Sequence, residues 1–189
     1  MSEKSVLKKK LIVDTAKKIF IRKGFKAVSM KDIVEACDIS RGGLYLYFSD
    51  TEEIFLEVLR QEAEAAEDIL SSADDASAAF DVLAAFMKAQ KKEILRIRKT
   101  LAVAKLEYFS SHKGSLLQQQ FDADVMHLAQ LIDLGVAGEV FAPVDSQAAA
   151  ENIMYVLEGL RTIALTGRVS EETIDKELMI LMQGLIIEE

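Results

Sequence analysis

The segment from Arg41 to Phe48 combines an arginine, two adjacent glycines and an aromatic run, and it follows a serine. Ser40 is a favoured helix N-cap, so the segment is expected to form a short helix. Two glycines cost a helix about 1 kcal/mol each relative to alanine, so their presence needs a reason. Close approach of the backbone to a DNA strand would supply one, because glycine has no side chain. A plain turn is the alternative interpretation.

Two earlier helices are predicted to position this segment. From Leu7 to Phe25 the apolar residues fall on one helical face, and Gly24 is well placed to end the helix in a left-handed conformation. Ser29 then starts a second helix, as the N-cap of a capping box with Asp32. The inward residues are Leu7, Leu11, Ile12, Ala16, Ile19 and Phe20 in the first helix, and Met30, Ile33, Val34 and Cys37 in the second.

Two short helices joined by a tight turn, and steadied by a longer first helix, predict a helix-turn-helix. The second helix of such a pair normally enters the major groove of DNA with its N-terminal residues at the base edges. In this chain those residues are Arg41, Gly42 and Gly43.

The charge distribution is compatible with this prediction, although the whole chain carries a net charge of −8. Residues 1–50 contain eleven Lys or Arg and six Asp or Glu, and residues 51–189 contain twelve and twenty-five. Such asymmetry suggests a basic module for a polyanion attached to an acidic body. A chance clustering of lysines on a solvated helix is the alternative.

Composition excludes several classes of protein. Helix formers dominate and Pro143 is the single proline, which favours an all-α fold. One cysteine, no signal peptide and no apolar run of about 18 residues predict a cytoplasmic protein without a membrane segment. The sequence has no glycine-rich phosphate loop, no nucleophile elbow and no zinc spacing, and His112 and His127 lack partners at ligand spacing. We therefore expect no enzyme activity, no catalytic residue, no metal and no cofactor.

The stretch RKGFKAVSMKDIVEACDISRGGLYLYFSDTEEIF carries several motifs at fixed spacing. A helix ends in Lys-Gly-Phe, a serine-capped helix follows, then come Ile-Ser-Arg-Gly-Gly-Leu-Tyr, Tyr-Phe and an acidic start of the next helix. From about Leu7 to Phe55 the chain resembles the DNA-binding domain of the TetR family of bacterial transcriptional regulators. The resemblance covers a little over a quarter of the chain.

This resemblance implies roles for individual residues. Lys31 would reach phosphate or a base edge, and Arg41 would make a bidentate contact with guanine. Gly42 and Gly43 would let the helix N-terminus approach the strand. Tyr45 and Tyr47 would reach phosphates or thymine methyls. The remaining residues of the implied DNA-binding set would mainly cap helices and would donate to phosphate only secondarily: Ser29, Ser40 and Thr51.

Two residues depart from the family pattern. Asp38 stands where the family usually has glycine in the turn between the paired helices, and aspartate tolerates the left-handed conformation better than most residues. Thr51 stands where many relatives have a phosphate-contacting lysine. A phosphate contact at Thr51 would therefore be weaker.

We expect two domains: a helix-turn-helix DNA-binding domain over 1–50, and a helical ligand-binding and dimerisation domain over 51–189. The predicted helices of the second domain cover 51–72, 76–98, 101–109, 116–136, 145–166 and 170–187. The last of these is apolar on all sides, which favours burial against both its own core and a partner subunit. A single large monomeric core is the alternative.

The helix over 145–166 could pair with the last helix in a four-helix interface, with Gly159 permitting close approach. The expected interface residues are Ile153, Leu157, Leu160, Leu178, Met182 and Leu185. A pocket for a small molecule is expected among Phe86, Met87, Glu107, Tyr108, Phe121, Met126 and His127, although stripes of Met and Phe are more often ordinary core.

The leading hypothesis is a sequence-specific regulator of transcription, a repressor that binds double-stranded operator DNA as a homodimer. A small hydrophobic effector would release it from a palindromic site. A helical protein-interaction module, or an activator on the same scaffold, is the alternative.

Overall fold

The computed structural model describes residues 3–112, 116–167 and 169–186, and only the backbone of Leu116 and Leu117. Within these ranges the regular elements are all helices, as the composition predicts. The chain divides into two compact units. The first comprises Met1–Glu62 with Arg98–Gly114, and the second comprises Ala63–Ile97 with Ser115–Glu189.

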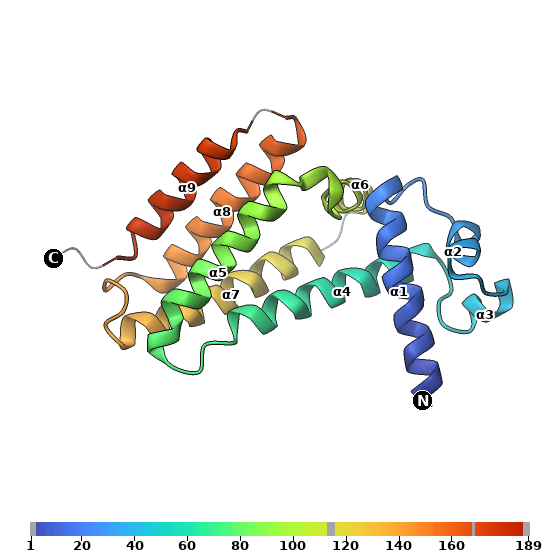
Figure 1. The fold of residues 1–189 in the computed structure, drawn as a ribbon, viewed down its shortest axis with the longest axis horizontal. Coiled ribbons are helices and arrows are strands. Elements are labelled where there is room, and N and C mark those ends of the chain that lie inside the picture. Colours follow the sequence, from blue (N-terminus) through green and yellow to red (C-terminus); the bar gives the residue numbers. More distant parts are fainter. Residues whose placement is uncertain (1–2, 113–115, 168, 187–189) are drawn as a thin grey trace. The chain divides into compact units, whose positions relative to one another are not determined.

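The first unit contains α1 (Glu3–Lys23), α2 (Met30–Cys37), α3 (Arg41–Tyr45), the first turns of α4 (Thr51–Leu70), and α6 (Ala102–Ser111) (Figure 1). A cluster of aromatic rings forms its centre. The ring of Phe55 lies 4.8 Å from that of Phe20 and 5.0 Å from that of Phe25. The ring of Tyr108, on α6, lies 5.0 Å from that of Phe25. The unit therefore extends beyond the expected segment 1–50, because α4 and α6 supply rings to its core.

The first helix begins at Glu3, and its buried face begins only at Ile12. Leu7 and Leu11, which the sequence pattern places with the core, are 62% and 51% exposed. In Figure 1 the N-terminal turns of α1 extend away from α2. The prediction for these two leucines is wrong, because the core of the unit packs along only the later turns of α1.

The third helix ends at Tyr45, three residues before the predicted end. The backbone N–H groups of Tyr47 and Phe48 both donate to the carbonyl of Leu44, at 2.9 and 3.2 Å. The resulting turn brings Phe48 into the core, where it is 3% exposed. The helix is therefore shorter than predicted because burial of this ring requires the chain to turn.

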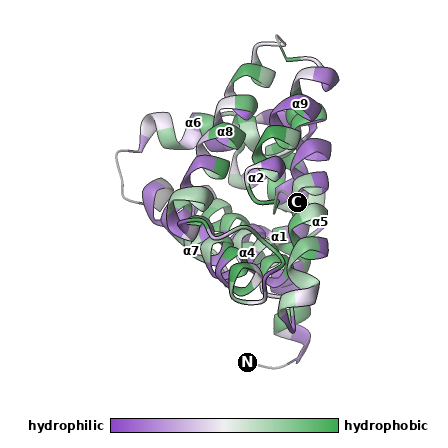
Figure 2. Ribbon diagram, turned by 90° about the vertical axis from the view of Figure 1, so that its left-hand side faces the viewer, coloured by the Kyte–Doolittle hydropathy of each residue, from purple (hydrophilic) through white to green (hydrophobic). Residues whose placement is uncertain are grey.

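The second unit packs α5 (Ala76–Leu95), α7 (Leu116–Ala137), α8 (Ser146–Leu165) and α9 (Glu171–Gln183), with the last turns of α4. A short 3-10 helix, η1 (Ile97–Lys99), follows α5. The central helix α8 contacts α5, α7 and α9. Figure 2 shows hydrophobic and hydrophilic residues alternating along the helices, as in amphipathic helices. In the part of the chain that the structure describes, no helix has the length and apolar character needed to cross a membrane.

Candidate nucleic-acid interface

The short helix α3 is anchored on one side and exposed on the other. Leu44 is fully buried. The hydroxyl of Ser40 accepts a hydrogen bond from the backbone N–H of Gly43 at 3.1 Å, which confirms Ser40 as the N-cap. We call the exposed side of this segment the α3 face; its residues are Arg41, Gly42, Tyr45 and Leu46.

The side chains of Arg41 and Tyr45 contact each other on the α3 face. The guanidinium carbon of Arg41 lies 5.6 Å from the centre of the Tyr45 ring, which is within cation–π distance. A guanidinium carries its N–H donors in one plane, in a fork that matches a planar, bidentate acceptor. The contact with Tyr45 thus holds this group at the exposed start of α3.

The two glycines of α3 differ in what surrounds them. A Cβ atom added to Gly43 would lie 3.0 Å from the hydroxyl oxygen of Ser40, so the capping contact partly explains this glycine. A Cβ atom added to Gly42 would meet nothing within 4 Å. Packing within the protein therefore gives no reason for glycine at position 42, whereas close approach of an external strand does.

The start of α2 has the predicted capping box. Ser29 accepts from the backbone N–H of Asp32 at 3.3 Å, and the Asp32 carboxylate accepts from the backbone N–H of Ser29 at 2.9 Å. Lys23 donates to the same carboxylate at 2.5 Å. The hydrogen bonds from Lys23 and Ser29 hold the pKa of Asp32 well below its usual range. Because the Ser29 hydroxyl also donates to Asp32 at 2.6 Å, capping is its main role.

The turn between α2 and α3 has the left-handed residue that the sequence predicts. Asp38 adopts the left-handed conformation, with φ of 50° and ψ of 48°, so the turn between α2 and α3 is kept without glycine. The ammonium group of Lys31 lies 3.8 Å from Glu35 on the same helix face, and its side chain is 83% exposed. Lys31 is therefore accessible to an anion beside α2. Tyr47 is partly buried against the core of the unit.

The expectation that Thr51 caps α4 is wrong. Thr51 is the first residue of the helix, and the carboxylate of Asp50 accepts from the backbone N–H of Glu53 at 2.8 Å. The Glu53 carboxylate accepts in turn from the backbone N–H of Ser49 at 2.6 Å. Carboxylates thus occupy this helix start, and their charge disfavours a phosphate beside Thr51.

Two residues expected in the ligand pocket, Glu107 and Tyr108, instead hold the first unit together. The Tyr108 hydroxyl donates to the Glu52 carboxylate at 2.9 Å, and its ring is in the aromatic core. The Glu107 carboxylate accepts from the backbone N–H of Lys26 at 3.0 Å and lies against Gly24, whose φ is 77°. These contacts join residues 56 and 81 positions apart, so no local pattern in the sequence reveals them.

The other expected pocket residues lie in the second unit and differ in their burial and in their neighbours. Phe86 and Met87 are buried on α5, while Met126 on α7 is 48% exposed. The ring of Phe121 packs 5.1 Å from that of Tyr155. His127 lies 3.6 Å from the carboxylate of Glu67.

Sequence reasoning also missed a polar cluster between α5 and α8. The guanidinium of Arg161 donates to Gln90 and Glu158 and lies 3.5 Å from the carboxylate of Glu93. Gln90 lies one turn beyond Phe86 on α5. The signal available in the sequence was a single arginine on a helix whose other charged residues are Glu151 and Glu158, and this pattern does not indicate its partners on α5.

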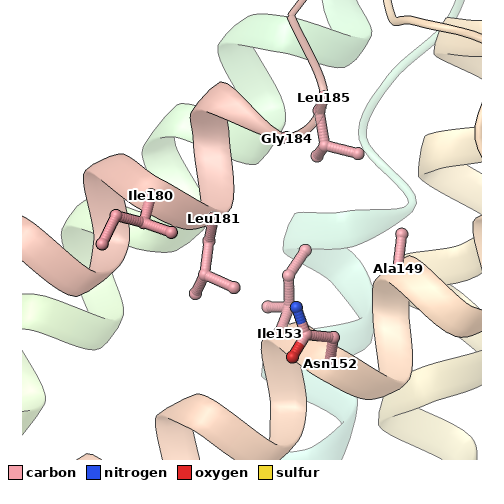
Figure 3. A pocket seen from close by; sticks show the side chains of 7 residues that line it. All are labelled: Ala149, Asn152, Ile153, Ile180, Leu181, Gly184 and Leu185. Atoms are coloured by element: carbon pink, nitrogen blue, oxygen red, sulfur yellow. The ribbon is translucent and has the colours of Figure 1, made fainter.

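A shallow cleft of about 110 Å³ lies between α8 and α9. Figure 3 shows Ile180 and Leu181 of α9 across from Ile153 and Asn152 of α8. Its full lining is Ala149, Asn152, Ile153, Ile180, Leu181, Gly184 and Leu185. Small-molecule sites are typically about 300–1,000 Å³, so this cleft is too small for one.

The residues expected at the dimer interface are mostly core residues of this chain. Five of the six are at most 8% exposed, so their side chains have almost no surface left for a partner: Ile153, Leu157, Leu160, Leu178 and Leu185. Met182 is partly buried. The exposed large apolar residues of these helices and the segment after α9 are Tyr155, Ile163, Met179, Ile180 and Ile186. An apolar pattern shows that two faces are hydrophobic without showing which one packs inside.

Raising the pH from 10 to 12 should destabilise the protein through Tyr108. Burial and the hydrogen bond to Glu52 raise the pKa of Tyr108 to about 12, from an ordinary value of 10.0. The folded state thus favours the neutral phenol, and this stabilisation is complete below pH 10 and lost as the pH rises to 12. The difference in unfolding free energy between wild type and Tyr108→Phe should therefore shrink over this range in urea titrations.

Tyr155→Phe, at a tyrosine that is 64% exposed, is the matched control for loss of a phenol. A wild-type advantage over Tyr108→Phe that is the same at pH 9 and pH 12 would contradict the assignment.

Known proteins resemble this chain in the region of the helix-turn-helix. A family model described as bacterial regulatory proteins, tetR family, matches residues 12–58, which run from α1 into α4. An uncharacterized HTH-type transcriptional regulator, YfiR of Bacillus subtilis (strain 168), is 29% identical over 142 residues, which are 72% of this chain and 69% of YfiR.

Solved structures share the fold. A TetR-family transcriptional regulator from Pectobacterium atrosepticum superposes with a TM-score of 0.73 at 21% identity, covering 100% of this chain and 99% of that one. The flavonoid-responsive regulator FrrA superposes with a TM-score of 0.62 at 21% identity, covering 96% and 98%. The family match lies on the helices that form the α3 face and its supporting core, so residues 12–58 resemble the bacterial regulatory proteins of the tetR family, and the solved structures share the fold of the chain.

Proposed function

We propose that this protein is a TetR-family transcriptional repressor that binds a pseudo-palindromic operator as a homodimer and leaves it when a small hydrophobic effector binds. The observation that carries the DNA-binding part is the α3 face. Arg41 lies there beside Gly42, a glycine that no contact within the protein requires. Two such faces, about 34–36 Å apart in a dimer, would enter successive major grooves.

The charges of the two compact units also support DNA binding through the first unit. The first unit contains sixteen Lys or Arg and eleven Asp or Glu, whereas the second contains seven and twenty. A basic unit is attracted to the phosphate backbone, and an acidic unit is repelled by it. The net charges thus favour contact with DNA through the first unit rather than through the second.

Substitutions on the α3 face should separate DNA affinity from folding. Arg41→Ala should weaken binding to a duplex selected from random-sequence DNA by about 5- to 150-fold, since a bidentate arginine–base contact is worth about 1–3 kcal/mol. Gly42→Ala should also weaken binding, yet raise the unfolding free energy by up to about 1 kcal/mol, because alanine favours the helix and its Cβ meets nothing. Gel mobility shift and urea unfolding measure the two effects.

Lys92→Ala is the matched control for Arg41→Ala, because it removes one positive charge from an exposed position in the acidic second unit. It should leave the affinity unchanged. A footprint that protects no palindrome at any salt concentration would overturn the proposed function.

The dimer interface proposed is the exposed apolar face of α8 and α9. Tyr155 and Ile163 on α8, with Met179 and Ile180 on α9, are between 46% and 64% exposed. An exposed apolar set on two neighbouring helices is typical of an interaction site. A Cβ atom on Gly159 would meet nothing within 4 Å in its own chain, which leaves room for a partner helix to approach α8 closely. This assignment keeps the helices predicted from sequence and changes the residues on them.

Gly159→Leu should weaken dimerisation without disturbing the fold of the protomer. The Cβ atom of the added side chain meets nothing within 4 Å in its own chain, so we expect the steric cost of leucine to arise at the interface. We expect the dimer dissociation constant to rise by at least about tenfold, equivalent to about 1.4 kcal/mol, in sedimentation equilibrium. Far-ultraviolet circular dichroism should be unchanged. An unchanged dissociation constant would place the interface on other helices.

The effector site proposed lies in the second unit, around Phe86 and Met87. These side chains are buried on α5, and the hydrogen bond from Arg161 to Gln90 lies one turn away. Apolar walls with a few oriented polar groups are typical of small-molecule sites. Because both side chains are buried, an effector would select a more open conformer, which misplaces the two α3 faces for their grooves. FrrA, which shares the fold, is flavonoid-responsive, so planar aromatic compounds are the first candidates.

A panel of flavonoids should release the wild-type protein from its selected duplex. Met87→Trp should keep DNA binding but need at least about tenfold more compound for release, because the larger ring fills the site. Leu95→Trp is the matched control, at a position on the same helix that is 45% exposed. Equal sensitivity of Met87→Trp and wild type in fluorescence anisotropy would show that the effector binds elsewhere.

A further inference from the structure

Leu46 has the largest exposed fraction among the large apolar residues that the structure describes, at 83%. It caps the C-terminus of α3, and its backbone N–H donates to the carbonyl of Gly42 at 3.2 Å. Leu44 and Phe48, two positions to either side, supply the buried anchors of this segment. The fold therefore gives no account of a leucine at position 46.

The geometry of α3 makes this leucine unusually accessible. Its backbone stays helical, with φ of −70° and ψ of −19°. Side chains on a helix lean toward the preceding turn, so Leu46 lies on the same side of α3 as Gly42, which is four residues earlier. Gly42 has no side chain to cover Leu46, and the space beside Gly42 is open. The α3 face thus carries two parallel pairs, Arg41 with Tyr45 and Gly42 with Leu46.

The surroundings of Leu46 fit a DNA base edge better than a protein surface. A protein-binding patch normally covers several hundred Å² of contiguous apolar surface. Here the other residues of the face are an arginine, a glycine and a tyrosine that is 44% exposed. In the major groove, a thymine presents a 5-methyl group, and a guanine presents two acceptors suited to arginine. One apolar and one guanidinium group side by side match two such bases.

From this juxtaposition, and resting on the proposed binding of DNA through α3, we infer that Leu46 contacts the 5-methyl group of a thymine. That thymine lies beside the base contacted by Arg41. Leu46 is then a specificity-determining residue: it favours thymine through an apolar contact, while Arg41 favours guanine through hydrogen bonds.

Removal of single methyl groups from the DNA tests this inference. The full-length protein first selects a duplex from random-sequence DNA, and each thymine of that site is then replaced by uracil, which lacks only the methyl group. At one thymine position in each half-site, the replacement should weaken wild-type binding about fourfold. This is the change in affinity expected when one buried methyl-sized group is lost. Leu46→Ala should bind the thymine and uracil duplexes equally at that position.

Two variants separate this inference from the proposed function. Leu106→Ala, at a leucine that is 59% exposed on α6, should respond to every uracil replacement as wild type does. If no duplex is selected, the proposed function fails and the inference fails with it. If a duplex is selected and Arg41→Ala weakens its binding, but each uracil replacement affects wild type and Leu46→Ala alike, the inference alone is overturned.

Discussion

Five residues are too few to hold an α-helix in water, so α3 depends on the burial of Leu44 and Phe48 for its existence. These two side chains fix the rotation of the segment about its own axis. That rotation places Arg41, Gly42, Tyr45 and Leu46 on the outside together. The cap at Ser40 determines where the helix begins, and the turn after Leu44 determines where it ends. The buried side chains of α3 thus determine which of its side chains are exposed.

The core that receives α3 is assembled from distant parts of the chain. Phe20 and Phe55 are buried against each other, and Tyr108 of α6 completes the ring cluster. Polar contacts fix α6 in the same place: Tyr108 donates to Glu52, and Glu107 accepts from the backbone of Lys26. A fragment that ends at residue 50 lacks both Phe55 and Tyr108, so the first compact unit is not a contiguous N-terminal segment.

Ion pairs neutralise part of the positive charge of the first unit. Lys9, Lys17 and Lys23 are paired with Glu57, Glu62 and Asp32. Surface pairs of this kind contribute little to stability, about 0–1 kcal/mol each, but they neutralise part of the field at close range. The charge imbalance of the unit therefore favours a polyanion at long range, whereas the proposed recognition of a sequence would depend on the few groups of the α3 face.

The sequence by itself determined the all-α fold, the helix-turn-helix, both serine caps and the left-handed turn at Asp38. These features depend on residues within a few positions of one another, where hydrogen bonding and backbone preference act directly. Tertiary structure decided which apolar residues are inside. Leu7 and Leu11 are exposed, Leu157 and Leu178 are buried, and Tyr108 lies in the core of the first unit. A hydrophobic pattern gives the face of a helix, but only the packing of helices distant in sequence determines what that face meets, or whether it meets anything.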